Sequence, residues 1–166
     1  MGHRGYRSPT SIFTATVLAV PSVDERVEML RKVWLFSECT PEELEHIAAL
    51  AERRSFDEAA EIIRQGDPGD DFYVIIDGQA VAAVDGDPIE VMGPGSFFGE
   101  ISLLDGGERL ATVTAKTALD VLVLTRDYFN DMLNMAMPEI TPRLLQVVGE
   151  RMRLLAQHEG KPVVGY

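Results

Sequence analysis

Apolar residues recur at helical spacing in two short segments that follow residue 21. In each segment a serine or threonine precedes a glutamate by three residues, the spacing of a capping box that opens a helix: Ser22 with Glu25, and Thr40 with Glu43. Pro41 takes the first helical position of the second segment. The apolar stripes predicted for the two helices are Val23, Val27, Leu30 and Trp34 in the first, and Leu44, Ile47, Ala48 and Ala51 in the second.

Between residues 54 and 124 the pattern changes to short apolar runs separated by turns. The turns are rich in glycine, aspartate and proline, as in Asp77-Gly78 and Gly93-Pro94-Gly95. Many short strands at regular intervals indicate a β-sandwich or jelly roll. The predicted strands are Ile62–Ile63, Phe72–Ile76, Ala80–Val84, Ile89–Met92, Thr112–Ala115 and Asp120–Leu124.

Helical spacing returns after residue 124. Thr125 is a predicted cap for a helix from Arg126 to about Met135, and Pro138 interrupts it. A longer helix is expected from Thr141, with Pro142 at its first helical position, to about Gln157. The inward residues predicted for these two helices are Tyr128, Phe129, Met132 and Leu133, and then Leu144, Leu145, Val148, Met152 and Leu155.

The length of 166 residues favours one domain, which we place at residues 22–158, with a tail at 159–166. Residues 1–21 are expected to form an arm, either disordered or docked on the domain as a strand or helix. Basic residues precede a mildly apolar run in this arm, which resembles a weak secretory signal. Threonines interrupt that run, no small-residue cleavage site follows it, and it is too short to span a bilayer. We therefore expect no membrane association.

Charge and cysteine content narrow the function classes. The net charge is −12, which opposes nucleic-acid binding because such binding depends on neutralising phosphates. Cys39 is the only cysteine, so the chain has neither an intrachain disulfide nor a cysteine zinc site, and a reducing cytoplasm is expected. The three histidines form no metal-ligand pattern, so no metal site is predicted. No nucleophile has a recognisable base, so the sequence does not indicate an enzyme.

One stretch, residues 97–113, concentrates the candidate chemistry. Gly99 permits close approach of the backbone to a ligand, and residues 100–104 can form one helical turn whose first amides face an anion. Glu100 offers a carboxylate for a sugar hydroxyl, and Arg109 offers a planar fork of donors for a phosphate. These groups together predict a nucleotide site. The alternative is a surface turn in which Glu100 and Arg109 only pair with each other.

Two segments resemble signatures of the cyclic nucleotide-binding domain family. Residues 62–78 are similar to its first signature: paired apolar residues, Gly-Asp, four apolar strand residues and a closing glycine. Residues 98–103, followed by Arg109, Ala111, Val113 and Ala115, resemble its second signature, the phosphate-binding cassette. The resemblance spans roughly residues 30–155. It implies an α+β fold, in which a β-roll (a jelly-roll-like antiparallel sandwich) is flanked by N-terminal helices and a C-terminal lid helix.

The resemblance also implies roles for individual residues. Glu100 would accept the ribose 2′-hydroxyl, Arg109 would pair with the cyclic phosphate, and the amides of Gly99, Ser102 and Leu110 would complete the phosphate cradle. Four residues of the first signature are expected to be structural, fixing turns between strands, and not to contact the ligand: Gly66, Asp67, Gly69 and Gly78. The predicted ligand-binding residues are Gly99, Glu100, Ile101, Ser102, Arg109, Leu110 and Ala111.

Leu110 departs from the family pattern, in which a small or hydroxyl residue follows the arginine. Members that favour cyclic GMP tend to carry a hydroxyl there, so the expected ligand is cyclic AMP, with cyclic GMP less favoured. The predicted function is a cyclic AMP sensor that signals through its terminal helices to a protein partner or a second copy. The alternative is a scaffold subunit of the same fold that has lost nucleotide binding, because the leucine crowds the phosphate.

Overall fold

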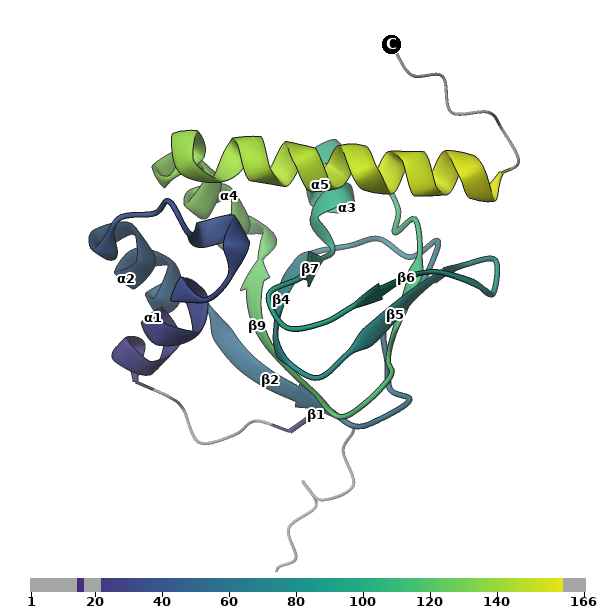
Figure 1. Ribbon diagram of the computed structural model, residues 1–166, viewed down its shortest axis with the longest axis horizontal. Helices are drawn as coiled ribbons and strands as arrows, with labels where there is room; N and C mark the ends of the chain where they lie inside the picture. Colours follow the sequence, from purple (N-terminus) through teal and green to yellow (C-terminus); the bar gives the residue numbers. More distant parts are fainter. Residues whose placement is uncertain (1–14, 17–21, 160–166) are drawn as a thin grey trace, which may run out of the picture.

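The computed structural model describes residues 15–16 and 22–159. Two antiparallel sheets form a β-roll, and helices cover one side of it (Figure 1). The first sheet has the order β1-β2-β9-β4-β7 and the second the order β3-β8-β5-β6. The strands are β1 Ala15–Thr16, β2 Glu52–Phe56, β3 Glu61–Ile63, β4 Asp71–Asp77, β5 Ala80–Val84, β6 Asp87–Met92, β7 Phe97–Phe98, β8 Thr112–Ala115 and β9 Leu119–Thr125. The predicted α+β fold with a β-roll is confirmed.

The helices lie before β2, after β9 and at one point within the roll. Both predicted capping boxes are present, at Ser22 and at Thr40. Thr125 stands at the predicted N-cap, but its side chain makes no capping hydrogen bond. The helices are α1 Val23–Arg31, the 3-10 helix η2 Trp34–Phe36, α2 Pro41–Leu50, α3 Glu100–Asp105, α4 Arg126–Met135 and α5 Met137–His158.

The central strands β4 and β9 are buried on both faces, which explains their continuous apolar sequences. Phe72 and Leu122 pack on the helical side, against residues of α1, α2, α4 and α5. Tyr73 and Val121 point the other way, into the interior of the β-roll. Because successive side chains of a strand face opposite sides, one apolar run supplies both cores. The sheet thereby fixes the helices on one side and the pocket-forming roll on the other.

The N-terminal prediction needs two corrections. The stripe of the first helix does not include Trp34, because α1 ends at Arg31 and the chain enters η2, where Leu35 and Phe36 are buried instead. Trp34 stays 45% exposed, and Val23 is exposed as well. Strand β2 was not predicted. Its residue Phe56 pairs with Ala15 of β1, so two residues of the predicted arm form a strand. The rest of the arm and the tail after residue 159 lie outside the described residues.

The long helix begins earlier than predicted. It starts at Met137, so Pro138, and not Pro142, occupies its first turn, where the missing N–H has no intrahelical acceptor in any case. Pro142 lies inside the helix. Of the inward residues predicted for α4 and α5, Tyr128, Leu145 and Met152 are exposed, whereas Phe129 and Leu144 are buried. Figure 1 shows α5 lying across the end of the roll, next to α3 and β6.

Candidate functional site

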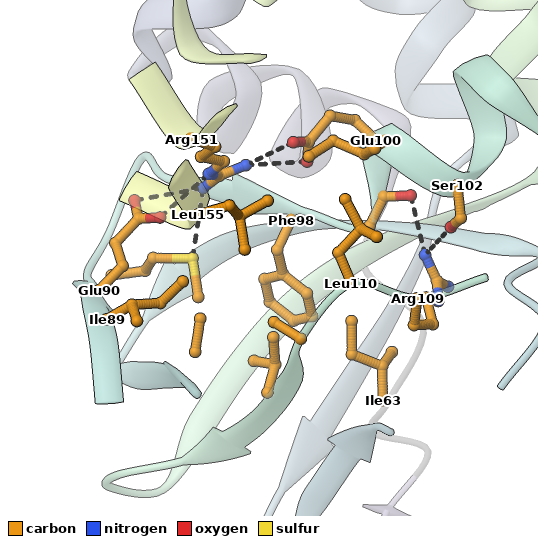
Figure 2. Close-up of a pocket in the computed structure, with 16 residues that line it drawn as sticks. Ile63, Ile89, Glu90, Phe98, Glu100, Ser102, Arg109, Leu110, Arg151 and Leu155 are labelled. Carbon is orange, nitrogen blue, oxygen red and sulfur yellow. Dashed lines mark hydrogen bonds and ion pairs between the residues drawn. The ribbon is translucent and has the colours of Figure 1, made fainter. Parts of the chain in front are cut away.

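A pocket lies between the β-roll, α3 and the C-terminal half of α5 (Figure 2). All seven residues predicted to bind ligand line it: Gly99, Glu100, Ile101, Ser102, Arg109, Leu110 and Ala111. Gly99 adopts a left-handed conformation with φ of 94° and is the N-cap of α3, which begins at Glu100 as the sequence predicted. The first amides of this helix therefore have no intrahelical acceptor.

Backbone pairing with the first signature positions Arg109. Its amide donates to the carbonyl of Asp67 at 2.8 Å, and its carbonyl accepts from the amide of Gly66 at 2.9 Å. Gly66 has φ of 92°, so it makes the predicted turn. Gly69 does more than was predicted, because a Cβ at that position would collide with the guanidinium of Arg109 and the hydroxyl of Ser102. The two signatures thus meet at the arginine.

The guanidinium of Arg109 is buried among neutral acceptors. Nη1 donates to the carbonyl of Gly99 and to the hydroxyl of Ser102, and Nη2 donates to the carbonyl of Asp71, each at 2.8 Å. The residue is 5% exposed, and burial lowers the pKa of Arg109, with Tyr73, Asp71 and Glu100 opposing it. These three bonds use three of the five N–H groups of an arginine. Within residues 15–16 and 22–159, the positive charge of Arg109 is therefore held in place without an ion pair.

Glu100 does not pair with Arg109, which corrects the alternative interpretation of this stretch. Its side chain is 2% exposed, and both carboxylate oxygens accept from Nη1 of Arg151 on α5, at 2.8 Å each. Arg151 was not predicted as a site residue. It was detectable as a basic residue within the apolar stripe, because it lies seven residues after Leu144 and four before Leu155.

Arg151 links α5 to three parts of the pocket. Besides Glu100, its Nε donates to Glu90 of β6 at 3.1 Å, and its Nη2 donates to the carbonyl of Phe97 at 2.6 Å. Its guanidinium also lies over the Phe97 ring, 5.3 Å from the centroid. Burial alone would lower the pKa of Arg151, but the charges of Glu100 and Glu90 outweigh burial and raise it. Figure 2 shows this arginine between the two glutamates at the α5 side of the pocket.

Leu110 and Ala111 complete the predicted set. Leu110 is 40% exposed and lines the pocket beside Arg109. The described residues do not gather three histidine, cysteine or acidic side chains in an arrangement for a metal ion. Within the same residues, no helix has the length and apolarity that crossing a bilayer requires.

Comparison with known proteins matches this architecture. Residues 53–135 match the model of the cyclic nucleotide-binding domain. The chain is 36% identical to a cAMP-dependent protein kinase regulatory subunit of Aspergillus niger, over 81% of the chain and 30% of that subunit. A solved structure described as Sp-2Cl-cAMPS bound to PKAR CBD2 has a TM-score of 0.74 at 26% identity, and the match covers 87% of this chain and 98% of that one.

A second solved structure, cAMP-bound PfPKA-R, has a TM-score of 0.76 at 28% identity, with 85% of this chain and 50% of that chain covered. The chain spans only 26% to 30% of the length of the kinase regulatory subunits it matches. The family match covers half of the chain and includes the pocket residues on α3 and around Arg109. This chain therefore belongs to the cyclic nucleotide-binding domain family.

Proposed function

We propose that this chain is a cyclic AMP sensor whose ligand lies in the pocket between α3, the β-roll and α5. The observation that carries the proposal is the environment of Arg109. A buried cation surrounded only by neutral acceptors is costly, and an anionic phosphate beside it would offset that cost. The cyclic phosphate of cyclic AMP carries one negative charge and would be this anion. Leu110 would place its amide at the phosphate and its side chain along the edge of the site.

Glu100 is proposed to accept the ribose 2′-hydroxyl. A carboxylate has about four lone-pair positions, and Arg151 uses one at each oxygen, so a hydroxyl donor can still be accommodated. Arg151 would then connect the sugar site to α5. Through this connection the occupancy of the pocket would be transmitted to the helices.

The regulatory part of the proposal is supported by the relatives. Several are named as regulatory subunits of cAMP-dependent protein kinase, and the two solved structures described above are named with cAMP or an analogue bound. We propose that residues 22–158 form the binding unit and that the terminal helices signal to a protein partner or a second copy. The chain would act by binding, without catalysis, and in the cytoplasm.

Calorimetric titration of the full chain with cyclic AMP and cyclic GMP tests the proposal. We expect binding of cyclic AMP, and we expect Arg109→Ala to weaken it by about 2–4 kcal/mol, roughly thirty- to nearly a thousand-fold, because a charge-assisted contact with the phosphate is lost. Arg31→Ala is the matched control, since Arg31 lies on α1 in an exposed pair with Glu28. This variant should titrate like the parent chain.

Two outcomes would overturn the proposal. Binding by Arg109→Ala within a few-fold of the parent would remove Arg109 from the phosphate site. A parent chain that binds neither nucleotide would instead identify a scaffold that has the fold without the ligand.

A further inference from the structure

The end of the pocket away from Arg109 is apolar except for one charged pair. Figure 2 shows Glu90, next to Ile89, on the opposite side of the pocket from Arg109. If Arg109 and Glu100 take the phosphate and the sugar, as proposed above, the charged groups left among the pocket residues are Glu90 and Arg151. The base would therefore lie against this end. Ile89 lies beside Glu90, and Met92 contacts Arg151 through its sulfur at 3.3 Å. The apolar lining of the pocket as a whole includes Ile63, Ala82, Ile89, Met92, Phe98 and Val113.

The hydrogen-bonding capacity of Arg151 is fully used by the protein. Its Nε and Nη2 face the two oxygens of Glu90 at 3.1 and 3.5 Å, Nη1 donates to both oxygens of Glu100, and Nη2 also donates to the carbonyl of Phe97. An arginine has five N–H groups, and these contacts account for all of them. The same fork occupies the edge of Glu90 that presents its two oxygens side by side. In this geometry Arg151 offers no donor to a base. Each oxygen of Glu90 keeps a lone pair for a single donor, as at Glu100, but the carboxylate no longer offers its two oxygens together.

The two purines differ in what a carboxylate would offer them. Guanine carries two adjacent donors, its ring N1–H and its amino group, which match the two oxygens of a carboxylate. Adenine carries one amino donor next to a ring nitrogen acceptor, which a carboxylate repels. A free Glu90 would therefore favour guanine. With the two-oxygen edge of Glu90 occupied, this carboxylate cannot pair with both donors of guanine, which disfavours guanine more than adenine at an otherwise apolar wall.

We propose that Arg151 determines base selectivity by occupying Glu90, and that this pair makes the pocket prefer cyclic AMP. Arg151 acts here as a positioning residue, because it changes the base site through Glu90 and not through a contact of its own. The proposal rests on the proposed function and adds the residue pair that sets the preference between two purine ligands.

The test compares the ratio of the Kd values for cyclic AMP and cyclic GMP in three forms of the full chain. Arg151→Met removes the fork, and we expect the ratio to move towards cyclic GMP by at least about tenfold, the effect of roughly one hydrogen bond. The double variant Glu90→Leu/Arg151→Met removes the freed carboxylate as well, and should restore the preference for cyclic AMP. Both variants lose the partner of Glu100, so the ratio cancels that common loss of affinity.

An unchanged ratio in Arg151→Met, or a shifted ratio that persists in the double variant, would overturn the inference. If Arg151→Met fails to fold or binds neither nucleotide, Arg151→Lys decides. A single ammonium cannot reproduce the fork to Glu90 while holding Glu100, so a smaller shift in the same direction supports the inference and no shift overturns it. If the parent chain binds cyclic AMP but the Kd ratio does not change in the Arg151 variants, the inference fails and the proposed function stands. A parent that binds neither nucleotide overturns both.

Discussion

The pocket contains two arginines with opposite electrostatic environments, Arg109, which is buried, and Arg151, whose side chain is 11% exposed. Among the described residues, Arg109 donates only to two carbonyls and one hydroxyl, and burial lowers its pKa. Arg151 lies between Glu100 and Glu90, which raise its pKa despite burial. A buried cation that no carboxylate contacts directly is suited to recruit an anion, whereas one in direct ion pairs is suited to hold elements of the fold together. The contrast supports the proposal that Arg109 serves the ligand and Arg151 the fold within a single pocket.

The largest expected effect of the contrast between Arg109 and Arg151 is on the free energy of unfolding. Arg151→Met leaves Glu100 buried without its partner, and breaking a buried ion pair in this way should cost about 3–5 kcal/mol. The melting temperature should fall by roughly 6–20 °C. Thermal or denaturant unfolding of the protein without nucleotide measures the change.

The matched variant is Arg109→Met, with the same side-chain replacement at the other arginine. It loses hydrogen bonds to neutral acceptors but also relieves the burial of an unneutralised charge, so its cost should stay below about 2 kcal/mol. Equal destabilisation by the two variants would show that both arginines are structural, and the comparison would fail.

The next largest effect is expected at the proposed sugar site. Its size depends on how many lone pairs of the Glu100 carboxylate Arg151 leaves for a ligand. Comparing cyclic AMP with 2′-deoxy cyclic AMP on the unmodified chain removes only the hydroxyl. A lost hydrogen bond to a charged acceptor should weaken binding by about 1.5–3 kcal/mol, roughly ten- to a hundred-fold or slightly more. Equal affinity of the two ligands would mean that Arg151 occupies Glu100 completely and that this carboxylate is structural.

The sequence predicted Arg109 as a site residue but not Arg151. The two arginines differ in how far along the chain their partners lie. Gly99, Glu100 and Arg109 lie in one loop whose residue types indicate phosphate chemistry locally. The partner of Arg151 is 51 residues away, and only the packing of α5 over α3 brings the two together. Strand β2 was missed for the same reason: its sequence, Glu-Arg-Arg-Ser-Phe, is polar, and its pairing with β9 joins distant segments. The start of α5 was predicted too late because both Pro138 and Pro142 are compatible with a first helical turn, and Pro142 was chosen.

The close packing behind Arg109 gives a third, smaller effect. Gly69→Ala places a Cβ against the guanidinium and against Ser102, so the arginine must shift from its acceptors. We expect cyclic AMP affinity to fall roughly tenfold, the result of about 1–2 kcal/mol of overpacking. Gly93→Ala is the control, since a Cβ there meets nothing within 4 Å and its backbone is not left-handed. Equal titrations of the two variants would show that the exact position of Arg109 is unimportant.

Leu110 should give the smallest effect, although it is the residue that departs from the family pattern. It is 40% exposed and lines the pocket beside Arg109, so its side chain can border the phosphate without displacing the groups that hold Arg109. Leu110→Ala should therefore keep cyclic AMP affinity within about threefold, an effect below about 1 kcal/mol. Leu110→Thr supplies a hydroxyl and should raise the relative affinity for cyclic GMP, as calorimetry with both nucleotides would show. A large gain of cyclic AMP affinity in Leu110→Ala would contradict this, because it would mean that the leucine obstructs the phosphate beside Arg109. The uncompensated charge of that arginine would then mark a site closed to its ligand, as expected for a scaffold subunit.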